Sequence, residues 1–207
     1  MERRDLAPLK VGITGPIGSG KSYVSAKLRE RGYSVYDSDS EAKRLVENSG
    51  EVRKAICKLL GDEAYNGQGA YQTKWVADRV FQNKTLLEGL NAIVHPSVFH
   101  DFLSWVSQRQ EEGTKLVFFE SALLPTVRRE YIRTLDCVVV VQASQMCRMQ
   151  RVMMRDFAAR EKILQRMANQ PSDAAFAAVA DYTLRNEDRM DIERQVENLL
   201  NMLLQKR

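Results

Sequence analysis

The residues in this chain best suited to chemistry stand together near its start. The string Gly15-Pro16-Ile17-Gly18-Ser19-Gly20-Lys21-Ser22 fits the pattern G-x-x-x-x-G-K-[ST]. Glycines at these positions let consecutive backbone N–H groups turn toward one anion, and a helix N-terminus behind them adds partial positive charge. The string therefore predicts a loop that binds the phosphates of a nucleoside triphosphate. The structural alternative is a glycine-rich turn between a strand and a helix, with an exposed lysine.

The sequence on both sides of this string favours the phosphate loop. Residues 9–14 alternate apolar and other residues, as a strand does, and residues 22–31 place Val24 and Leu28 four apart, as a helix does. Lys21 is expected to reach the β and γ phosphates, and Ser22 to hold Mg²⁺ through its hydroxyl. ATP or GTP binding is therefore predicted, with these nucleotide contacts: Gly15, Gly18, Ser19, Gly20, Lys21, Ser22 and Tyr23.

Three classes of nucleotide-binding protein can be compared with the rest of the chain. A regulatory GTPase should carry an N/T-K-x-D motif, and the nearest string, Asn83-Lys84-Thr85-Leu86, lacks the aspartate. A motor or transporter ATPase should have a strand that ends in aspartate, whereas the best candidate here ends Phe118-Phe119-Glu120 in a chain of only 207 residues. A small-molecule kinase remains, and this class predicts a second, arginine-rich lid near the nucleotide.

Residues 144–155 fit such a lid. Arg148, Arg151 and Arg155 are spaced three and four apart, so they share one helical face and could clamp phosphates. A merely solvated face is the alternative. The opposite face carries methionines that are expected to pack in the core. A second helix should follow and end before Pro171, and three of its side chains should point inward. The methionines are Met146, Met149 and Met153, and the inward side chains are Ile163, Leu164 and Met167.

Two aspartates follow the second expected strand, residues 33–36. Asp37 and Asp39 are two apart, so both would face the same side if the strand continued. A hydroxyl that attacks the γ phosphate needs a proton acceptor, and Asp39 could serve. The alternative is an N-cap for a helix that begins near Glu41, a role open to Asp39 or Ser40.

The order of the expected elements predicts the fold class. Residues 115–120 and 136–142 are continuous apolar runs, typical of strands buried on both faces of a parallel sheet, and residues 181–185 could form a last strand. An amphipathic helix should follow from Asp191. Residues 41–110 read as helical, with a loop at 61–69 and no convincing strand. We expect an α/β P-loop fold, a doubly wound parallel sheet in one domain (1–207) with a helical insert at about 40–98 and a lid at about 144–171.

Composition limits the possible partners. With 31 basic and 27 acidic residues, the net charge of +4 suits an anionic ligand but is small for a nucleic-acid-binding protein. The longest apolar stretches fall far short of the ~20 residues that cross a bilayer. Residues 1–10 have no apolar segment of a secretory signal, so a short frayed leader and a cytoplasmic location are expected. Three cysteines without CxxC spacing and only two histidines argue against disulfides and zinc. The oligomeric state stays open.

Taken together, these motifs resemble the dephospho-CoA kinase family from Lys10 onward. The phosphate loop and the Asp37-Ser38-Asp39 string are similar to the opening of its members. Later segments also match in order and spacing: Leu90-Asn91-Ala92-Ile93-Val94-His95-Pro96, Glu120-Ser121-Ala122-Leu123-Leu124, Arg155-Asp156, Arg166, Gln170, Ala180-Asp181-Tyr182 and Asn186.

This resemblance implies transfer of the ATP γ-phosphoryl group to the ribose 3′-hydroxyl of dephospho-CoA. By the resemblance, Asp39 is the catalytic base, Lys21 and Arg155 are also catalytic, and Arg151 and Arg155 contact ATP phosphates. The insert would bind the CoA portion. The implied substrate-binding residues are Asp37, Asp39, His95 and Glu120. Another small-metabolite or nucleoside kinase, or a nucleotide-dependent regulatory protein, is the alternative.

The chain departs from the family pattern at several positions. Pro16 and Tyr23 stand where the family usually has glycine and threonine. Pro125 and Thr126 replace a common aromatic-glutamate ending, so Glu120 is the only acid of this segment that is expected near the site. His95 has two open interpretations, a substrate contact or the start of a helix at Pro96.

Overall fold

The computed structural model describes residues 7–188 and 190–205. Most of the expected leader, residues 1–6, therefore lies outside the described residues. Contacts divide the chain into two compact units. The first runs up to Tyr36 and resumes at Val106, and the second comprises Asp37–Trp105. The expected insert of residues 40–98 lies within the second unit.

The first unit is built on a five-stranded sheet in the order β2-β3-β1-β4-β5. The strands are β1 (Leu9–Thr14), β2 (Ser34–Asp37), β3 (Leu116–Glu120), β4 (Cys137–Gln142) and β5 (Tyr182–Arg185). β1 pairs in parallel with both β3 and β4, and β4 pairs in parallel with β5. The predicted α/β class with a parallel sheet is confirmed. Because parallel strands end at one edge, the segments after β1, β3, β4 and β5 come together there.

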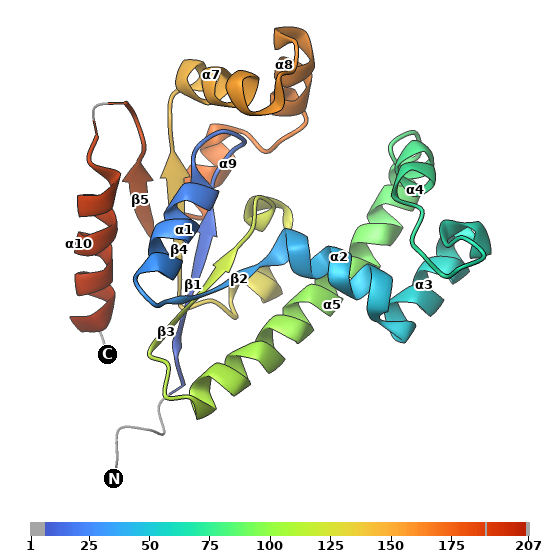
Figure 1. Cartoon of the computed structure of the whole chain (residues 1–207), viewed down its shortest axis with the longest axis horizontal. Coiled ribbons are helices and arrows are strands. Elements are labelled where there is room, and N and C mark those ends of the chain that lie inside the picture. Colours follow the sequence, from blue (N-terminus) through green and yellow to red (C-terminus); the bar gives the residue numbers. More distant parts are fainter. Residues whose placement is uncertain (1–6, 189, 206–207) are drawn as a thin grey trace. The chain divides into compact units, whose positions relative to one another are not determined.

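Helices cover this sheet and extend beyond its carboxyl edge. α1 (Lys21–Glu30) and α10 (Ile192–Gln205) share one apolar core with the strands. α10 buries the stripe expected from the sequence: Ile192, Val196, Leu199, Leu200 and Leu203. The remaining helices of this unit are η2 (Leu124–Thr126), α6 (Arg129–Ile132), α7 (Gln145–Asp156), α8 (Arg160–Ala168) and α9 (Asp173–Ala178). α7 and α8 lie beyond the ends of β1 and β4, next to the loop that follows β1 (Figure 1).

The second unit is helical, as predicted. It contains α2 (Ser38–Asn48), α3 (Gly50–Leu60), η1 (Asp62–Ala64), α4 (Thr73–Val80) and most of α5 (Lys84–Glu111). Its core is formed by Val46, Val52, Ile56, Ala64, Tyr65, Val76 and Val80. The interpretation that Pro96 starts a helix is wrong, because Pro96 lies in the interior of α5.

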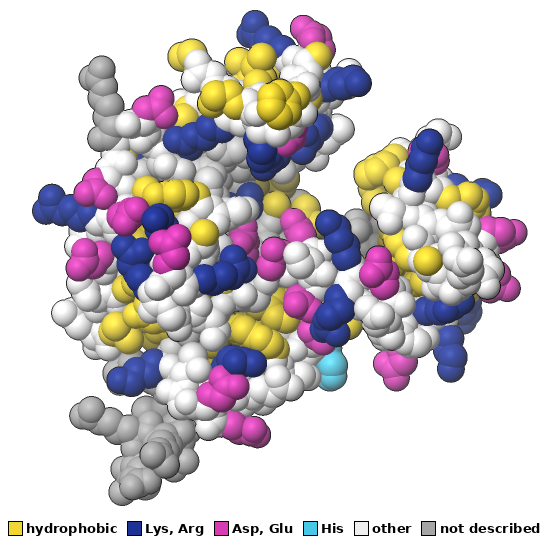
Figure 2. All heavy atoms as spheres, in the orientation of Figure 1, with side chains coloured by type: hydrophobic (Ala, Val, Ile, Leu, Met, Phe, Trp, Pro, Cys, Tyr) yellow, Lys and Arg dark blue, Asp and Glu magenta, His cyan; other side chains and the backbone are white. Residues whose placement is uncertain are grey.

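The buried face of α7 differs from the prediction. Met146 and Met153 were expected in the core, but they are 67% and 38% exposed, while Arg148 is only 6% exposed. Leu164 of α8 was expected to point inward and is also exposed. Hydrophobic side chains gather on the surface of the α7–α8 segment at the top of Figure 2. The expectation failed because helical spacing shows which residues share a face, but not which face a neighbouring element covers.

Candidate active site

The predicted phosphate loop connects β1 to α1 at the carboxyl edge of the sheet. Gly15, Gly18 and Gly20 all have positive φ angles. At Gly18 a Cβ atom would lie 2.5 Å from the carbonyl oxygen of Arg148, so α7 packs directly against the loop. Glycine is therefore required at Gly18 both by backbone conformation and by space.

The N-terminus of α1 is arranged to receive an anion. Gly20 is the N-cap residue, with φ 97° and ψ 23°, and no side chain of the described residues caps this end. Lys21 and Ser22 are the first two residues of the helix. The backbone N–H groups of a first helical turn need partners from outside the helix, and phosphate oxygens provide them well. The predicted residues of the phosphate loop are thus brought together in one place.

Glu120 lies beside this helix terminus. It ends β3, is 7% exposed, and its Oε1 accepts a hydrogen bond of 3.1 Å from the Ser22 hydroxyl. A P-loop serine joined to an acid from a neighbouring strand is the arrangement that holds Mg²⁺ in this class of fold. Sequence reasoning placed Glu120 among the substrate-binding residues, whereas its hydrogen bond joins it to Ser22.

The donor set fits magnesium. The hydroxyl of Ser22 and the carboxylate of Glu120 are oxygen ligands, which Mg²⁺ prefers. Among the residues that the structure describes, no three His, Cys, Asp or Glu side chains form a metal-binding cluster. A site with few protein ligands suits Mg²⁺, because this ion keeps several waters and binds substrate phosphates.

The three lid arginines have different environments. Arg151 lies beside the phosphate loop, where one guanidinium nitrogen (Nη1) is 4.0 Å from the Cβ position of Gly20. That nitrogen is buried and has no hydrogen-bond partner in the described part of the chain. Its other terminal nitrogen is 3.5 Å from Asp188. A buried guanidinium nitrogen without a partner is costly, so this position favours a bound anion.

Arg155 and Arg148 are engaged by acids. Arg155 donates to both carboxylate oxygens of Asp156, at 2.6 and 3.1 Å, and Arg166 contacts the same carboxylate. These two arginines hold the pKa of Asp156 well below its usual range. Arg148 donates to both oxygens of Asp173, at 3.1 and 3.0 Å. Of the three arginines, Arg151 has the contact with the loop that fits a phosphate ligand.

Two contacts to the loop were missed by sequence reasoning. Gln170 accepts a hydrogen bond of 2.7 Å from the backbone N–H of Ile17. Asn186, directly after β5, donates one of 2.8 Å to the backbone carbonyl of Ser19. Both residues belong to segments that resemble the family pattern, which was their only signal in the sequence.

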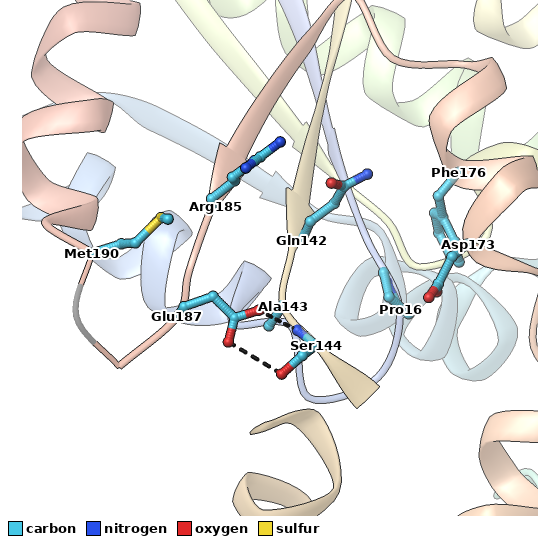
Figure 3. Close-up of a pocket in the computed structure, with 9 residues that line it drawn as sticks. All are labelled: Pro16, Gln142, Ala143, Ser144, Asp173, Phe176, Arg185, Glu187 and Met190. Carbon is cyan, nitrogen blue, oxygen red and sulfur yellow. Dashed lines mark hydrogen bonds between the residues drawn. The ribbon is translucent and has the colours of Figure 1, made fainter. Parts of the chain in front are cut away.

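A cavity of about 300 Å³ opens beside the start of the loop, at Pro16. Arg185 and Gln142 extend into this region from the neighbouring strands β5 and β4 (Figure 3). Glu187 accepts hydrogen bonds from the backbone N–H and the hydroxyl of Ser144, which joins the segment after β5 to the start of α7. The full lining is Pro16, Gln142, Ala143, Ser144, Asp173, Phe176, Arg185, Glu187 and Met190.

Comparison with known proteins now decides the family. The family model described as dephospho-CoA kinase matches residues 9–191. The dephospho-CoA kinase of Bacteroides fragilis is 35% identical over 198 residues, covering 96% of this chain and 94% of that protein. The dephospho-CoA kinase of Porphyromonas gingivalis is 38% identical over 200 residues, covering 96% of each chain. The chain belongs to the dephospho-CoA kinase family.

Solved structures agree with this family fold. A crystal structure from Thermus thermophilus superposes with a TM-score of 0.79 at 34% identity, covering 96% of this chain and 99% of that one. The dephospho-CoA kinase of Campylobacter jejuni gives a TM-score of 0.61 at 19% identity, covering 96% and 98% of the two chains. Shikimate kinase from Acinetobacter baumannii gives 0.58 at 18%, covering 100% and 99%. The last two likenesses show the P-loop kinase fold alone.

The dephospho-CoA kinase family match extends through the second unit, which carries the other predicted site residues. Asp37 caps α2, since its carboxylate accepts from the backbone N–H groups of Asp39 and Ser40 and from the Ser40 hydroxyl. The alternative interpretation, in which Asp39 or Ser40 caps this helix, is therefore wrong. Asp39 lies in the first turn of α2 and not in an extended strand, so the expected strand alternation also fails there.

His95 lies within α5 of the second unit, and burial lowers the pKa of its imidazole. The neutral form is therefore favoured near pH 7.

In the described part of the chain, no helix has the length and apolar character needed to cross a membrane.

Proposed function

We propose that the protein transfers the γ-phosphoryl group of ATP to the ribose 3′-hydroxyl of dephospho-CoA, giving CoA and ADP. One observation carries the chemistry: the Ser22 hydroxyl is bonded to the buried carboxylate of Glu120 at the start of α1, directly after the phosphate loop. Membership of the dephospho-CoA kinase family supports the choice of acceptor.

Ser22 and Glu120 would hold Mg²⁺, which spreads the negative charge of the transferring phosphoryl group when it is bound. The backbone N–H groups at the start of α1 orient the phosphates, and Lys21 lies in the same helical turn. Arg151 adds a guanidinium group next to Gly20. These groups place positive charge around the phosphates without forming a covalent bond to them.

Asp39 would accept the proton of the attacking hydroxyl. The support is its place in the string Asp37-Ser38-Asp39 and the resemblance of that string to the family pattern. The carboxylate of Asp37 accepts a 3.1 Å hydrogen bond from the backbone N–H of Asp39. The cap of α2 therefore also sets the position of the proposed base. We assign substrate contacts to Asp37 and His95 on the same ground of resemblance.

Arg155 would act on the nucleotide only after a change of partner, since it now binds Asp156 on both oxygens. We propose that phosphate replaces Asp156 on Arg155, and that Arg155 then stabilises the transition state.

The insert, about 40–98, would bind the CoA portion. Five of its basic residues are candidates for the diphosphate. Arg44 is bound to Glu41 and Asp101, and Arg53 lies over the ring of Tyr65, which leaves Lys43, Lys54 and Lys58 as better candidates. We also propose a cytoplasmic location, where coenzyme A synthesis takes place.

The decisive experiment is mass analysis of the products after mixing the protein, ATP, Mg²⁺ and dephospho-CoA. We expect a product heavier than dephospho-CoA by one phosphoryl group, at a rate that depends on Mg²⁺. Lys21→Ala should remove most of the transfer and leave the protein folded, and Lys84→Ala, with its side chain 89% exposed on α5, is the matched control. Adenosine, tested in parallel as the acceptor, distinguishes a nucleoside kinase from a dephospho-CoA kinase.

A contrary result would take one of two forms. Comparable kcat/KM for adenosine and dephospho-CoA would leave a kinase but refute the CoA assignment. ATP binding without any acceptor-stimulated turnover would favour a nucleotide-dependent regulatory protein.

A further inference from the structure

We infer that Gln170 is a positioning residue for the phosphate loop. Its side-chain oxygen accepts a 2.7 Å hydrogen bond from the backbone N–H of Ile17, across 153 positions of sequence. Gln170 lies between α8 and α9, so it reaches the loop from the far end of the lid segment. The inference rests on the proposed kinase function.

The contact acts on the part of the loop where the chain changes direction. Ile17 comes just before Gly18, which has φ 78°, and the N–H of Ser19 turns back to the carbonyl of Pro16. By taking up the N–H of Ile17, Gln170 fixes the orientation of the Pro16–Ile17 peptide. The N–H groups that follow, up to the first turn of α1, are then directed toward one anion.

The start of the lid segment packs against the next residue of the turn. The carbonyl of Arg148 lies 2.5 Å from the Cβ position of Gly18, and its guanidinium binds Asp173, three residues after Gln170. The two ends of the α7–α8 segment therefore reach adjacent residues of the loop, Gln170 at Ile17 and Arg148 at Gly18. Through these contacts the shape of the loop depends on the position of the lid.

The chemistry of the side chain also fits this role. A glutamine oxygen accepts the Ile17 N–H without adding charge. A glutamate would accept the same hydrogen bond but would place a negative charge next to the bound triphosphate, which weakens ATP binding. An apolar residue of similar length would fill the space and release the N–H.

Three variants test the inference. Gln170→Met removes the acceptor, Gln170→Glu keeps it and adds charge, and Gln165→Met alters an exposed glutamine of α8 as the matched control. The measurements are amide hydrogen exchange at Ile17, binding of Mg-ATP without acceptor, the kinetics of phosphoryl transfer, and the melting temperature. Because Mg-ATP binding needs no second substrate, it can fail or succeed independently of the proposed CoA reaction.

For Gln170→Met we expect fast exchange at Ile17 and Mg-ATP affinity lowered about tenfold, equivalent to ~1.4 kcal/mol, with the melting temperature changed by about 4 °C or less. Gln170→Glu should restore protection at Ile17 but not the full Mg-ATP affinity. Affinity in Gln170→Met within twofold of Gln165→Met would overturn the inference. Equal losses of melting temperature and affinity in both Gln170 variants would show a structural role only and would also overturn it.

Discussion

Replacing Gly20 with alanine should damage the protein through one identified contact. Gly20 has φ +97°, and a Cβ atom there would lie 2.0 Å from the side-chain nitrogen of Asn186. That nitrogen donates the 2.8 Å hydrogen bond to the Ser19 carbonyl. Alanine must therefore both adopt a left-handed conformation and displace Asn186.

The magnitude follows from these two effects. A non-glycine residue in the left-handed region costs about 1–2 kcal/mol. Loss of the Asn186 hydrogen bond costs about 0.5–1.5 kcal/mol more. Gly20→Ala should therefore lower the free energy of unfolding by about 1.5–3.5 kcal/mol, less the gain of about 0.4–1 kcal/mol from the stiffer unfolded chain.

Gly32 supplies the matched control. It has φ +82°, but nothing lies within 4 Å of its Cβ position. Gly32→Ala should carry the same left-handed strain and the same effect on the unfolded chain, so the difference between the two variants isolates the displacement of Asn186. We expect that difference to be about 1 kcal/mol in urea unfolding. Mg-ATP binding should be lost in Gly20→Ala and retained in Gly32→Ala.

The background variant Asn186→Ala sharpens the comparison. In this background the side chain that would be displaced is absent, so Gly20→Ala should cost only as much stability as Gly32→Ala does. Equal costs for Gly20→Ala and Gly32→Ala in the unaltered protein would refute the reasoning, because they would mean that Asn186 moves away without loss.

Three further predictions concern other parts of the molecule. Asp39→Asn should lower turnover by about 10²–10⁴ with Mg-ATP affinity nearly unchanged; a drop in melting temperature alone would make Asp39 structural. Burial lowers the pKa of His95, so the unfolded chain binds its proton more tightly, and stability should fall as pH falls below about 6.5. His95→Gln should flatten that slope in urea unfolding between pH 7 and 5, and an unchanged slope would exclude His95 as its source. Phe157 is 94% exposed at φ +49°, so Phe157→Gly should stabilise the protein by about 0.5–1 kcal/mol; a loss of stability would show that the ring makes a contact that matters.

The sheet could be predicted because its strands carry strong local signals. Residues 115–120 and 136–142 are uninterrupted apolar runs, and their cores are buried on both faces of the sheet as β3 and β4. The phosphate loop could also be predicted from a local signal, since a motif of eight residues specifies both the turn and the start of α1. Patterns of this kind need no knowledge of distant partners.

The faces of α7 could not be predicted in the same way. The hydrophobic character of the side chains predicted that the methionines are buried and the arginines exposed. The guanidinium of Arg148 is instead buried, and it donates two hydrogen bonds to Asp173, 25 residues later in the sequence. A paired charge can be buried where an unpaired one cannot. Spacing along one helix contains no information about a partner on another, so the sequence could not distinguish Arg148 from Arg151.

The candidate site likewise contains some residues that a local motif predicts and others that only the tertiary structure brings together. Lys21 and Ser22 follow from the motif, but the role of Glu120 depends on β3 lying beside β1, where Ile13 pairs with Glu120. Once that pairing exists, the acid at the end of β3 must lie near the residues that follow β1, because parallel strands deliver their carboxyl ends to one edge. The glutamine and asparagine that hold the loop arrive at this edge from the segments after α8 and β5. The motif therefore specifies the groups that we propose to bind the phosphates, and the topology of the sheet selects the side chains that contact those groups.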